Sequence, residues 1–299
     1  MSKRRYVLPL VWMVISSVAV ADRTFAAEPA GVKPDYASRS LTEIPNAQAL
    51  RATIWLPGLN EGYVPQGIVL LGNRLLVSAY KSTDQKQDRG PCRLFALDAR
   101  TGAVLGQLDL PKACGHAGGL AKGEGTTLLV SDTRLLIEIE LDDKQAKIPG
   151  RVRRMIRLAG GVKGSFAASD ANGFWLGEYA RNDAGKLFRF TWEALRKPQL
   201  TEADAAETLP APQRAQGAAV DIHGGLWVMR SGSKFGELVR LDRRTGIVVA
   251  RFAMPVGAEG ISFASDGALW TLSEAGSQRW NDWQAFHPLA FRYDPKLLK

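Results

Sequence analysis

Cysteine, histidine and long apolar runs are scarce in this sequence. Its 299 residues include two cysteines and three histidines, and no CxxC pair occurs. These numbers exclude the cysteine- and histidine-rich frameworks of structural zinc sites. Beyond the first 21 residues, no stretch approaches the roughly 20 apolar residues of a membrane-spanning helix. The sequence therefore predicts no membrane span after that N-terminal segment.

Familiar catalytic and modification motifs are also missing. The sequence has no GxSxG elbow, no HExxH pair, no Walker phosphate loop and no Asn-x-Ser/Thr sequon. Any chemistry must therefore come from side chains that the fold brings together from distant parts of the chain.

Acidic residues are outnumbered, with 30 Asp and Glu against 39 Lys and Arg, for a formal charge of +9. The basic residues are scattered, and "RVRRMIR" at 151–157 is the only dense cluster. Binding to nucleic acid needs a concentrated basic face, ideally with aromatic platforms. We therefore expect a solvated strand face at 151–157 and no nucleic-acid partner.

The first 21 residues are typical of a secretory signal peptide. Basic "MSKRR" precedes the apolar "YVLPLVWMVISSVAVA", and Ala19-Val20-Ala21 supplies small residues at the cleavage positions. A retained N-terminal anchor is the alternative. We expect a signal peptide over 1–21, a poorly structured leader over 22–50 and one domain over 51–299, monomeric and either periplasmic or secreted. In such an oxidising compartment, Cys92 and Cys114 are expected to form a disulfide.

A unit of about 48 residues recurs along the chain. The hairpin "LDARTGAV" at 97–104 returns as "LDRRTGIV" at 241–248, which is 144 residues later. A second pattern has small apolar residues, a turn and then bulky apolar residues. It occurs as "QGIVLLGNRLLVSAY" (66–80), "GGLAKGEGTTLLVSDT" (118–133), "SFAASDANGFWLGEY" (165–179), "QGAAVDIHGGLWVMRS" (216–231) and "EGISFASDGALWTLSE" (259–274).

Four strands in such a unit match one blade of a β-propeller. The stretch from Gly67 to Lys299 holds close to five units, so we predict an all-β, five-bladed propeller, with six blades as the alternative. The last unit stops after its third strand, whereas "ATIWLPGL" at 52–59 stands alone before the first. We predict that 52–56 pairs with 289–293 and closes the ring, because closure removes exposed sheet edges.

Two blade segments carry a family resemblance. "EGISFASDGALWTLSEAG" and "AQGAAVDIHGGLWVMRSGS" resemble NHL-repeat and SMP-30/gluconolactonase-like propellers, and "VPQG" and "HAGGL" are similar to segments of uncharacterised bacterial secreted propellers. The resemblance covers about 60–277. It implies a divalent ion such as calcium over the channel, with Glu259 and Asp132 at acidic ligand positions. The asparagines of that family are absent from the blade starts, so no metal-ligand set is assigned; Gln66, Gly118, Ser165 and Gln216 stand there instead.

Residues that precede the first strand or follow the second strand of each blade should surround one mouth of the central channel. Convergent polar groups over an apolar scaffold are typical of a small-molecule site. The predicted ligand-binding residues are Gln66, Tyr80, His116, Asp132, Glu178, Tyr179, Gln216, Arg230, Glu259 and Glu274. Among them, Glu259, His116 and Glu178 are the candidate catalytic residues, and Glu259 with Glu274 is a candidate acid–base pair.

Structural roles explain the same residues as well. Hydrogen bonds to backbone amides at blade junctions would account for Gln66, Gln216 and Glu259. A structural ion-pair network would account for Glu178, Arg230 and Glu274. The loop 275–288 contains three aromatic residues that either cap the core or form a platform for a sugar ring or a peptide side chain; these are Trp280, Trp283 and Phe286.

Three functions follow from these predictions. The first is an exported propeller that binds a small-molecule or carbohydrate-like ligand at the mouth. The second is a hydrolase, lactonase-like or lyase-like enzyme that uses the mouth carboxylates, with or without a divalent metal. The third is a protein-interaction scaffold in the cell envelope that uses a blade face or the segment 151–157.

Overall fold

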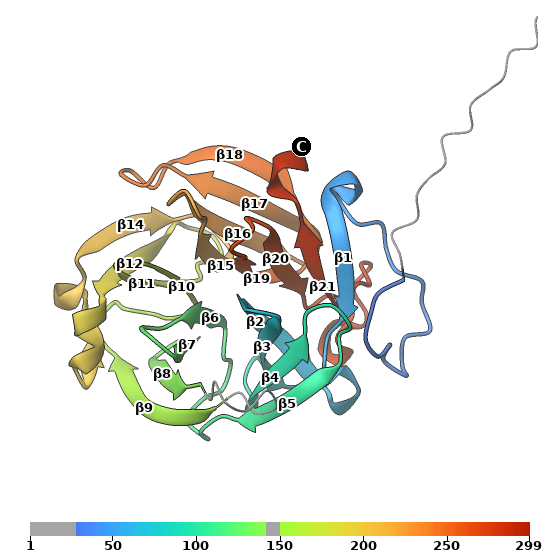
Figure 1. Cartoon of the computed structure of the whole chain (residues 1–299), viewed down its shortest axis with the longest axis horizontal. Coiled ribbons are helices and arrows are strands. Elements are labelled where there is room, and N and C mark those ends of the chain that lie inside the picture. Colours follow the sequence, from blue (N-terminus) through green and yellow to red (C-terminus); the bar gives the residue numbers. More distant parts are fainter. Residues whose placement is uncertain (1–27, 142–149) are drawn as a thin grey trace, which may run out of the picture.

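Five mainly antiparallel sheets form a ring in the computed structural model, which describes residues 28–141 and 150–299 (Figure 1). The predicted five-bladed β-propeller is confirmed. The predicted signal peptide, 1–21, lies outside the described residues. Within the described residues, no helix has the length and apolar character needed to cross a membrane.

Each blade runs outward from an inner strand at the channel. Blade 1 is β2 (Tyr63–Leu71), β3 (Arg74–Lys81), β4 (Cys92–Asp98) and β5 (Val104–Asp109). Blade 2 is β6 (Gly119–Lys122), β7 (Thr127–Asp132), β8 (Leu135–Glu140) and β9 (Arg151–Leu158), with β13 (Gln199–Leu200) added parallel to β9. Blade 3 is β10 (Phe166–Asp170), β11 (Gly173–Gly177), β12 (Gly185–Thr191) and β14 (Glu207–Ala211).

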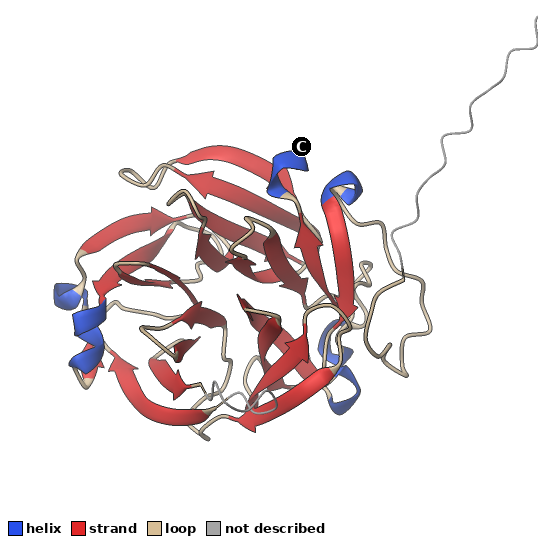
Figure 2. Cartoon of the chain, viewed as in Figure 1, coloured by secondary structure: helices blue, strands red, loops and turns tan. Residues whose placement is uncertain are grey.

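The last two blades follow the same order. Blade 4 is β15 (Ala215–Val220), β16 (Leu226–Gly232), β17 (Phe235–Leu241) and β18 (Val248–Ala253). Blade 5 is β19 (Ala258–Phe263), β20 (Leu269–Ser273), β21 (Leu289–Tyr293) and β1 (Leu50–Trp55). The short helices of the described chain are 3-10 turns at the rim, including Trp192–Arg196 and Glu202–Asp204 (Figure 2).

Burial follows the position of each strand in its blade. The second strands are packed on both faces between neighbouring sheets, and every residue of β7, β11 and β20 is buried. The outer strand β18 instead alternates exposed with partly buried residues. Strands covered on both faces read as continuous apolar runs, whereas half-covered strands alternate. This difference explains why the second strand of each unit gave the clearest signal in the sequence.

The repeated hairpin turn is held by an aspartate in both copies. The Asp98 Oδ1 accepts hydrogen bonds from the backbone N–H groups of Arg100 (3.0 Å) and Thr101 (2.8 Å). The Asp242 carboxylate holds the second copy in the same way. The Thr245 hydroxyl (2.8 Å) and the backbone bonds lower the pKa of Asp242, and the backbone bonds lower the pKa of Asp98. The "LD-x-R-TG" repeat is therefore a turn signature and belongs to the scaffold.

The N-terminal strand closes the ring as predicted. β1 pairs antiparallel with β21, with Thr53 opposite Phe291 and Trp55 opposite Leu289. In Figure 1, β1 lies beside β21 at the outer side of blade 5. The described part of the preceding leader also contacts this blade, since the Tyr36 hydroxyl donates to the backbone oxygen of Gly276 (2.9 Å). It thereby touches the loop between β20 and β21.

Glycine lets the inner strands approach one another at the channel. A Cβ at Gly260 would lie 2.9 Å from the backbone oxygen of Gln66 and from the Cα of Gly67, and a Cβ at Gly67 would lie 2.8 Å from the backbone nitrogen of Leu120. Such distances leave no room for a side chain. Because these glycines crowd around the channel, the residues directly before them converge at its mouth.

Candidate functional site

A cavity of about 600 Å³ lies at the mouth of the channel. It takes lining residues from all five blades and from the loop after β20. Seven of the ten predicted ligand-binding residues line it: Gln66, Tyr80, His116, Tyr179, Gln216, Glu259 and Glu274. Most of the side chains predicted from the repeat therefore line one cavity.

Two glutamates in contact form the most unusual feature of this cavity. Glu259 is the second residue of β19, and Glu274 directly follows β20. Their side chains are 2% and 8% exposed, and their carboxyl groups are hydrogen-bonded to each other. A carboxylate has no hydrogen to donate, so a hydrogen bond between two carboxyl groups requires that one of them is protonated. We call Glu259 and Glu274 the carboxyl dyad.

The two members of the dyad have different surroundings. Burial and the neighbouring Glu274 raise the pKa of Glu259 well above its usual value. Burial also raises the pKa of Glu274, to about 7, although the indole N–H of Trp280 (2.8 Å) and the amide of Gln66 (3.2 Å) donate to its Oε2. The Gln216 amide donates to Glu259 Oε1 (2.9 Å). Near pH 7 the shared proton is thus held mainly on Glu259.

Gln66 and Gln216 hold carboxyl groups of the dyad. The Gln66 amide also donates to the backbone oxygen of Pro65 (2.9 Å), so it combines a backbone bond with its bond to the dyad. The bond expected from Gln216 at a blade junction goes to the Glu259 side chain across the boundary between blades 4 and 5. Both glutamines therefore orient the dyad from neighbouring blades.

His116 supplies a neutral nitrogen to the same cavity. Its ring stacks on Tyr80 with centroids 4.6 Å apart, and its Nδ1 lies 2.6 Å from the backbone oxygen of Asp88. A carbonyl oxygen only accepts, so Nδ1 carries the proton and Nε2 is left as an acceptor. Burial lowers the pKa of His116, which keeps the ring neutral near pH 7.

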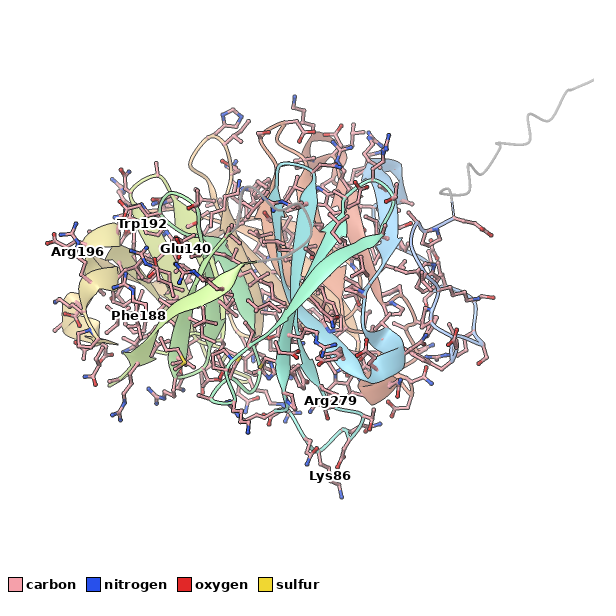
Figure 3. All side chains as sticks on the ribbon, turned by 60° about the horizontal axis from the view of Figure 1, so that its bottom comes forward. Lys86, Glu140, Phe188, Trp192, Arg196 and Arg279 are labelled. Atoms are coloured by element: carbon pink, nitrogen blue, oxygen red, sulfur yellow. The ribbon has the colours of Figure 1, made fainter. Side chains whose placement is uncertain are left out.

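An aromatic and cationic wall stands beside the dyad. Trp280 and Trp283 stack with centroids 4.7 Å apart, and the Arg279 guanidinium lies 4.3 Å from the Trp280 ring centroid. Arg279 also donates to the Tyr80 hydroxyl and to the backbone oxygen of Gln85 (2.9 Å). Figure 3 shows Arg279 at the same end of the molecule as Lys86, whose loop projects beyond the blades.

The three aromatic residues of the loop 275–288 have different roles, some at the cavity and one in the core. Trp280 and Trp283 line the cavity, whereas Phe286 is 1% exposed and packs in the core between blades 4 and 5. The first two form an aromatic wall of the mouth, and the third caps the core.

Three predicted residues do not line the cavity, and each has a structural partner. Glu178 pairs with Lys163, and Arg230 pairs with Glu237 (2.5 Å). Asp132 accepts from the guanidinium of Arg89 (3.1 Å). Its carboxylate also accepts from the backbone N–H groups of Gly115 and His116 (3.1 and 2.9 Å), so it positions the loop that carries the cavity histidine.

Backbone strain gathers around the mouth. Among the described residues, four that are not glycine have positive φ, and three of them lie here: Ala117 (φ 51°), Thr133 (φ 20°) and Arg214 (φ 59°). Thr133 and Arg214 line the cavity, and Ala117 follows His116. Left-handed conformations cost about 1–3 kcal/mol each for such residues and concentrate at functional sites.

The donor set around the mouth is poor in metal ligands. Across 28–141 and 150–299, no three His, Cys, Asp or Glu side chains gather where they could share an ion. Asp132, expected near a ligand position, instead pairs with Arg89. The divalent ion implied by the family resemblance therefore has no clear ligand group among these residues.

The two cysteines lie next to each other behind the His116 loop. Both are buried free thiols in this structure. Their hydrogen bond, with burial, raises the pKa of Cys92. The two side chains are in contact, and the predicted disulfide between them stays a prediction.

Several residues that line the cavity could not be predicted from the sequence repeat. Asp88, Arg181, Arg214 and Arg279 come from connecting loops whose lengths differ between blades. Ser231 lies on β16 and belongs to the fourth repeat unit, but a serine in a strand resembles ordinary polar packing. A count of arginines in the irregular loops would have been the only sequence signal for the cationic part of the cavity.

Comparison with known proteins gives the fold and no family. No protein-family model matches the sequence, and no curated protein matches it. The structure of Myxococcus xanthus glutaminyl cyclase is similar, with a TM-score of 0.56 and 13% identity over 82% of this chain and 94% of that chain. The chain is a β-propeller. At such low identity the likeness shows the fold alone.

Other similar structures are more distant. Luciferin-regenerating enzyme has a TM-score of 0.47 at 9% identity, over 79% of this chain and 92% of that chain. Virginiamycin B lyase from Staphylococcus aureus has a TM-score of 0.39 at 15% identity, over 75% and 81%. The resemblance to NHL-repeat and SMP-30-like propellers stays a prediction from the sequence.

Proposed function

We propose that this protein is an enzyme that catalyses a reaction by general acid–base transfer at the channel mouth, with Glu259 and Glu274 as the proton-transferring pair. The observation that carries the proposal is the buried contact between the two carboxyl groups at the edge of an open cavity. A carboxyl group with a pKa near the working pH can both accept and return a proton, which is the requirement for such catalysis.

The surroundings of the dyad support a small, polar substrate. A cavity of about 600 Å³ is within the range that encloses small molecules. Trp280 and Trp283 offer a flat face to an apolar or ring-shaped part of the substrate, and the Nε2 of His116 accepts a hydrogen bond from it. In the proposed reaction, Glu274 accepts a proton from the attacking group, and Glu259 donates one to the leaving group.

Peptides with an N-terminal glutamine are the first substrates to test. The name of the similar Myxococcus xanthus structure suggests this reaction, although the likeness itself carries only the fold. In the cyclisation, the α-amine attacks the side-chain amide carbon, the C–N bond to the amide nitrogen breaks, and ammonia leaves. One proton leaves the amine and one is added to the departing nitrogen. A carboxyl dyad in which one member accepts a proton and the other donates one therefore supplies both proton transfers.

The test compares single substitutions in the dyad with a distant control. Ammonia release from glutaminyl peptides, and hydrolysis of lactones and glycosides, are measured for the native protein and for Glu259→Gln, Glu274→Gln and Glu140→Gln. The control residue pairs with Arg151 on the outer side of blade 2. We expect either dyad substitution to lower kcat about 100-fold or more, since general acid–base catalysis contributes about 10²–10⁴. Dyad variants that turn over the substrate as fast as the native protein would refute the assignment.

Binding without chemistry is the second candidate function, and the stacked pair of Trp280 and Trp283 favours it. Stacked aromatic rings at a cavity wall suit a carbohydrate-like ligand. A sugar that binds tightly, is not altered, and binds equally well to Glu274→Gln would identify this function in place of the first.

The scaffold function has less support. In the segment 151–157, Arg153 and Arg154 pair with the buried carboxylate of Glu138 (3.2 and 2.5 Å), and Arg151 pairs with Glu140 (2.6 Å). Two carboxylates of the same blade thus offset half of the four positive charges in this segment, which leaves a weaker basic surface for a partner.

We also propose that the protein is exported to the periplasm or the medium, and that Cys92 and Cys114 form a disulfide there. The N-terminal residues support export, and the contact between the two buried thiols supports their pairing under oxidising conditions.

A further inference from the structure

Two arginines on one side of the mouth lack a partner. Arg181 follows β11, and Arg214 precedes β15; both line the cavity. Within the described residues, neither guanidinium has an ion pair or a hydrogen bond. Other cations near the mouth are paired, as Lys163 is with Glu178 and Arg89 is with Asp132. A guanidinium has five N–H donors, so two unused groups on one cavity leave many donors open.

The backbone brings these two arginines together. The N–H of Arg214 donates to the backbone oxygen of Ala180 (2.7 Å), so Arg214 lies next to the residue that precedes Arg181. Its φ of 59° is in the left-handed region, which is strained for a residue other than glycine. The neighbouring contacts thus fix a strained backbone at Arg214 and bring the backbones of the two arginines next to each other at the cavity wall.

A buried hydroxyl without a partner adjoins them. The N–H of Ser231 donates to the backbone oxygen of Arg214 (3.1 Å), and Ser231 lines the same cavity. Ser231 is 1% exposed, and its Oγ has no hydrogen-bond partner among residues 28–141 and 150–299. Leaving such a group unsatisfied is unfavourable, and a ligand oxygen that accepts from it would remove that cost.

The same segment leads directly to the dyad. Gln216, two residues after Arg214, donates to Glu259. Two residues of extended chain span about 7 Å. A small molecule can therefore contact both the arginine pair and the carboxyl dyad at once. The cavity is lined by four arginines and three carboxyl residues, with Asp88 the only one outside the dyad.

We propose that Arg181, Arg214 and Ser231 form an anion-binding subsite that anchors a carboxylate or phosphate group of the substrate. The substrate is then a small molecule with an anionic oxygen group at one end and its reacting group at the dyad. This inference rests on the proposed function, because it assigns the substrate class of the same cavity. Guanidinium forks suit both anions, since each presents two oxygen acceptors in the required geometry.

The test measures probe binding by calorimetry at low ionic strength, with no turnover required. The probes are glutarate, its neutral diamide and inorganic phosphate. The variants are Arg181→Gln, Arg214→Asn, Ser231→Ala and the control Lys186→Gln, whose ammonium pairs with Glu202 away from the cavity (3.1 Å). Asparagine tolerates left-handed backbone, so Arg214→Asn removes the charge without disturbing the fold. We expect each arginine variant to weaken anion binding about tenfold or more, and the serine variant to weaken it less.

Each outcome decides the proposal. Tighter binding of glutarate or of phosphate identifies which anion the subsite prefers, and loss of that binding in both arginine variants supports the subsite. Equal binding of the neutral diamide, no binding of either anion, or unchanged binding in the arginine variants would overturn it. The double variant Glu259→Gln, Glu274→Gln separates this inference from the proposed function. If the subsite is right, that variant binds the anion even if the dyad proves to have no catalytic role.

Discussion

At the scale of single residues, the dyad differs from an ordinary buried ion pair. Neither Glu259 nor Glu274 forms a salt bridge among the described residues, and both are held by neutral donors from Gln66, Gln216 and Trp280. Neutral donors stabilise a carboxylate less than a cation does, so burial raises both pKa values. A pair built only for stability would gain more from apolar replacements of similar volume.

Trp280 tunes the dyad through a single hydrogen bond. Its indole N–H stabilises the Glu274 carboxylate and so lowers the pKa of that group. Trp280→Phe keeps most of the ring and removes the donor, so the pKa of Glu274 should rise. If Glu274 acts as the base, the rate increases with pH through this pKa. The rising limb of the pH–rate profile should then move to higher pH, by about one unit for one charge-assisted bond.

The matched control for this experiment is Trp283→Phe, because Trp283 stacks on Trp280 without donating to the dyad. It should lower substrate affinity and leave the pH profile in place. If Trp280→Phe changes the rate but does not move the profile, its role is packing alone and Glu274 is not the titrating base.

At the scale of elements, the loop 82–91 and the segment 111–118 together position His116. The N–H of Gly90 donates to the backbone oxygen of Gly115 (2.8 Å), and the Asp88 carbonyl holds the histidine ring. Cys92 opens β4 directly after the loop, and Cys114 lies in the segment. A bond between the two sulfurs would tie together the two pieces of chain that support the histidine.

Oxidation of these thiols should therefore stabilise the protein and the His116 loop. We expect the protein recovered after export to weigh about 2 Da less than the reduced chain, one hydrogen being lost from each thiol. Cys92→Ser should lower the free energy of unfolding by about 3 kcal/mol under oxidising conditions, as for a loop of this length. Reducing agent should have the same effect on the native protein and none on the variant. A mass equal to that of the fully reduced mature chain would contradict the proposed disulfide.

At the scale of the whole molecule, the ring determines what the sequence could reveal. The blade pattern follows from covered strands, aspartate-held turns such as that of Asp98, and the close approach at Gly67 and Gly260. These three features recur in most blades. The five blades, the closure by β1 and most of the mouth residues were predictable for that reason. The positions directly before the inner-strand glycines converge because the ring requires it.

The chemistry of the mouth was less predictable because it depends on contacts that do not repeat. The hydrogen bond between Glu259 and Glu274 forms only once, at the join between β19 and the loop after β20. Arg181 and Arg214 come from irregular loops, and their lack of partners among the described residues is a property of the folded state. Likewise, the pairing of Glu178 with Lys163, which keeps this candidate out of the cavity lining, has no signature in the sequence.

The most direct test of the shared proton between Glu259 and Glu274 is infrared difference spectroscopy of the carboxyl groups as a function of pH. The account predicts that near pH 7 the native protein shows the carbonyl band of a protonated carboxyl group, and that this band is weaker in Glu259→Gln, where only Glu274 remains to contribute to it. A second protonated band should appear as the pH falls through the pKa of Glu274, about 7. A native spectrum at pH 7 with no protonated carboxyl group would contradict the account.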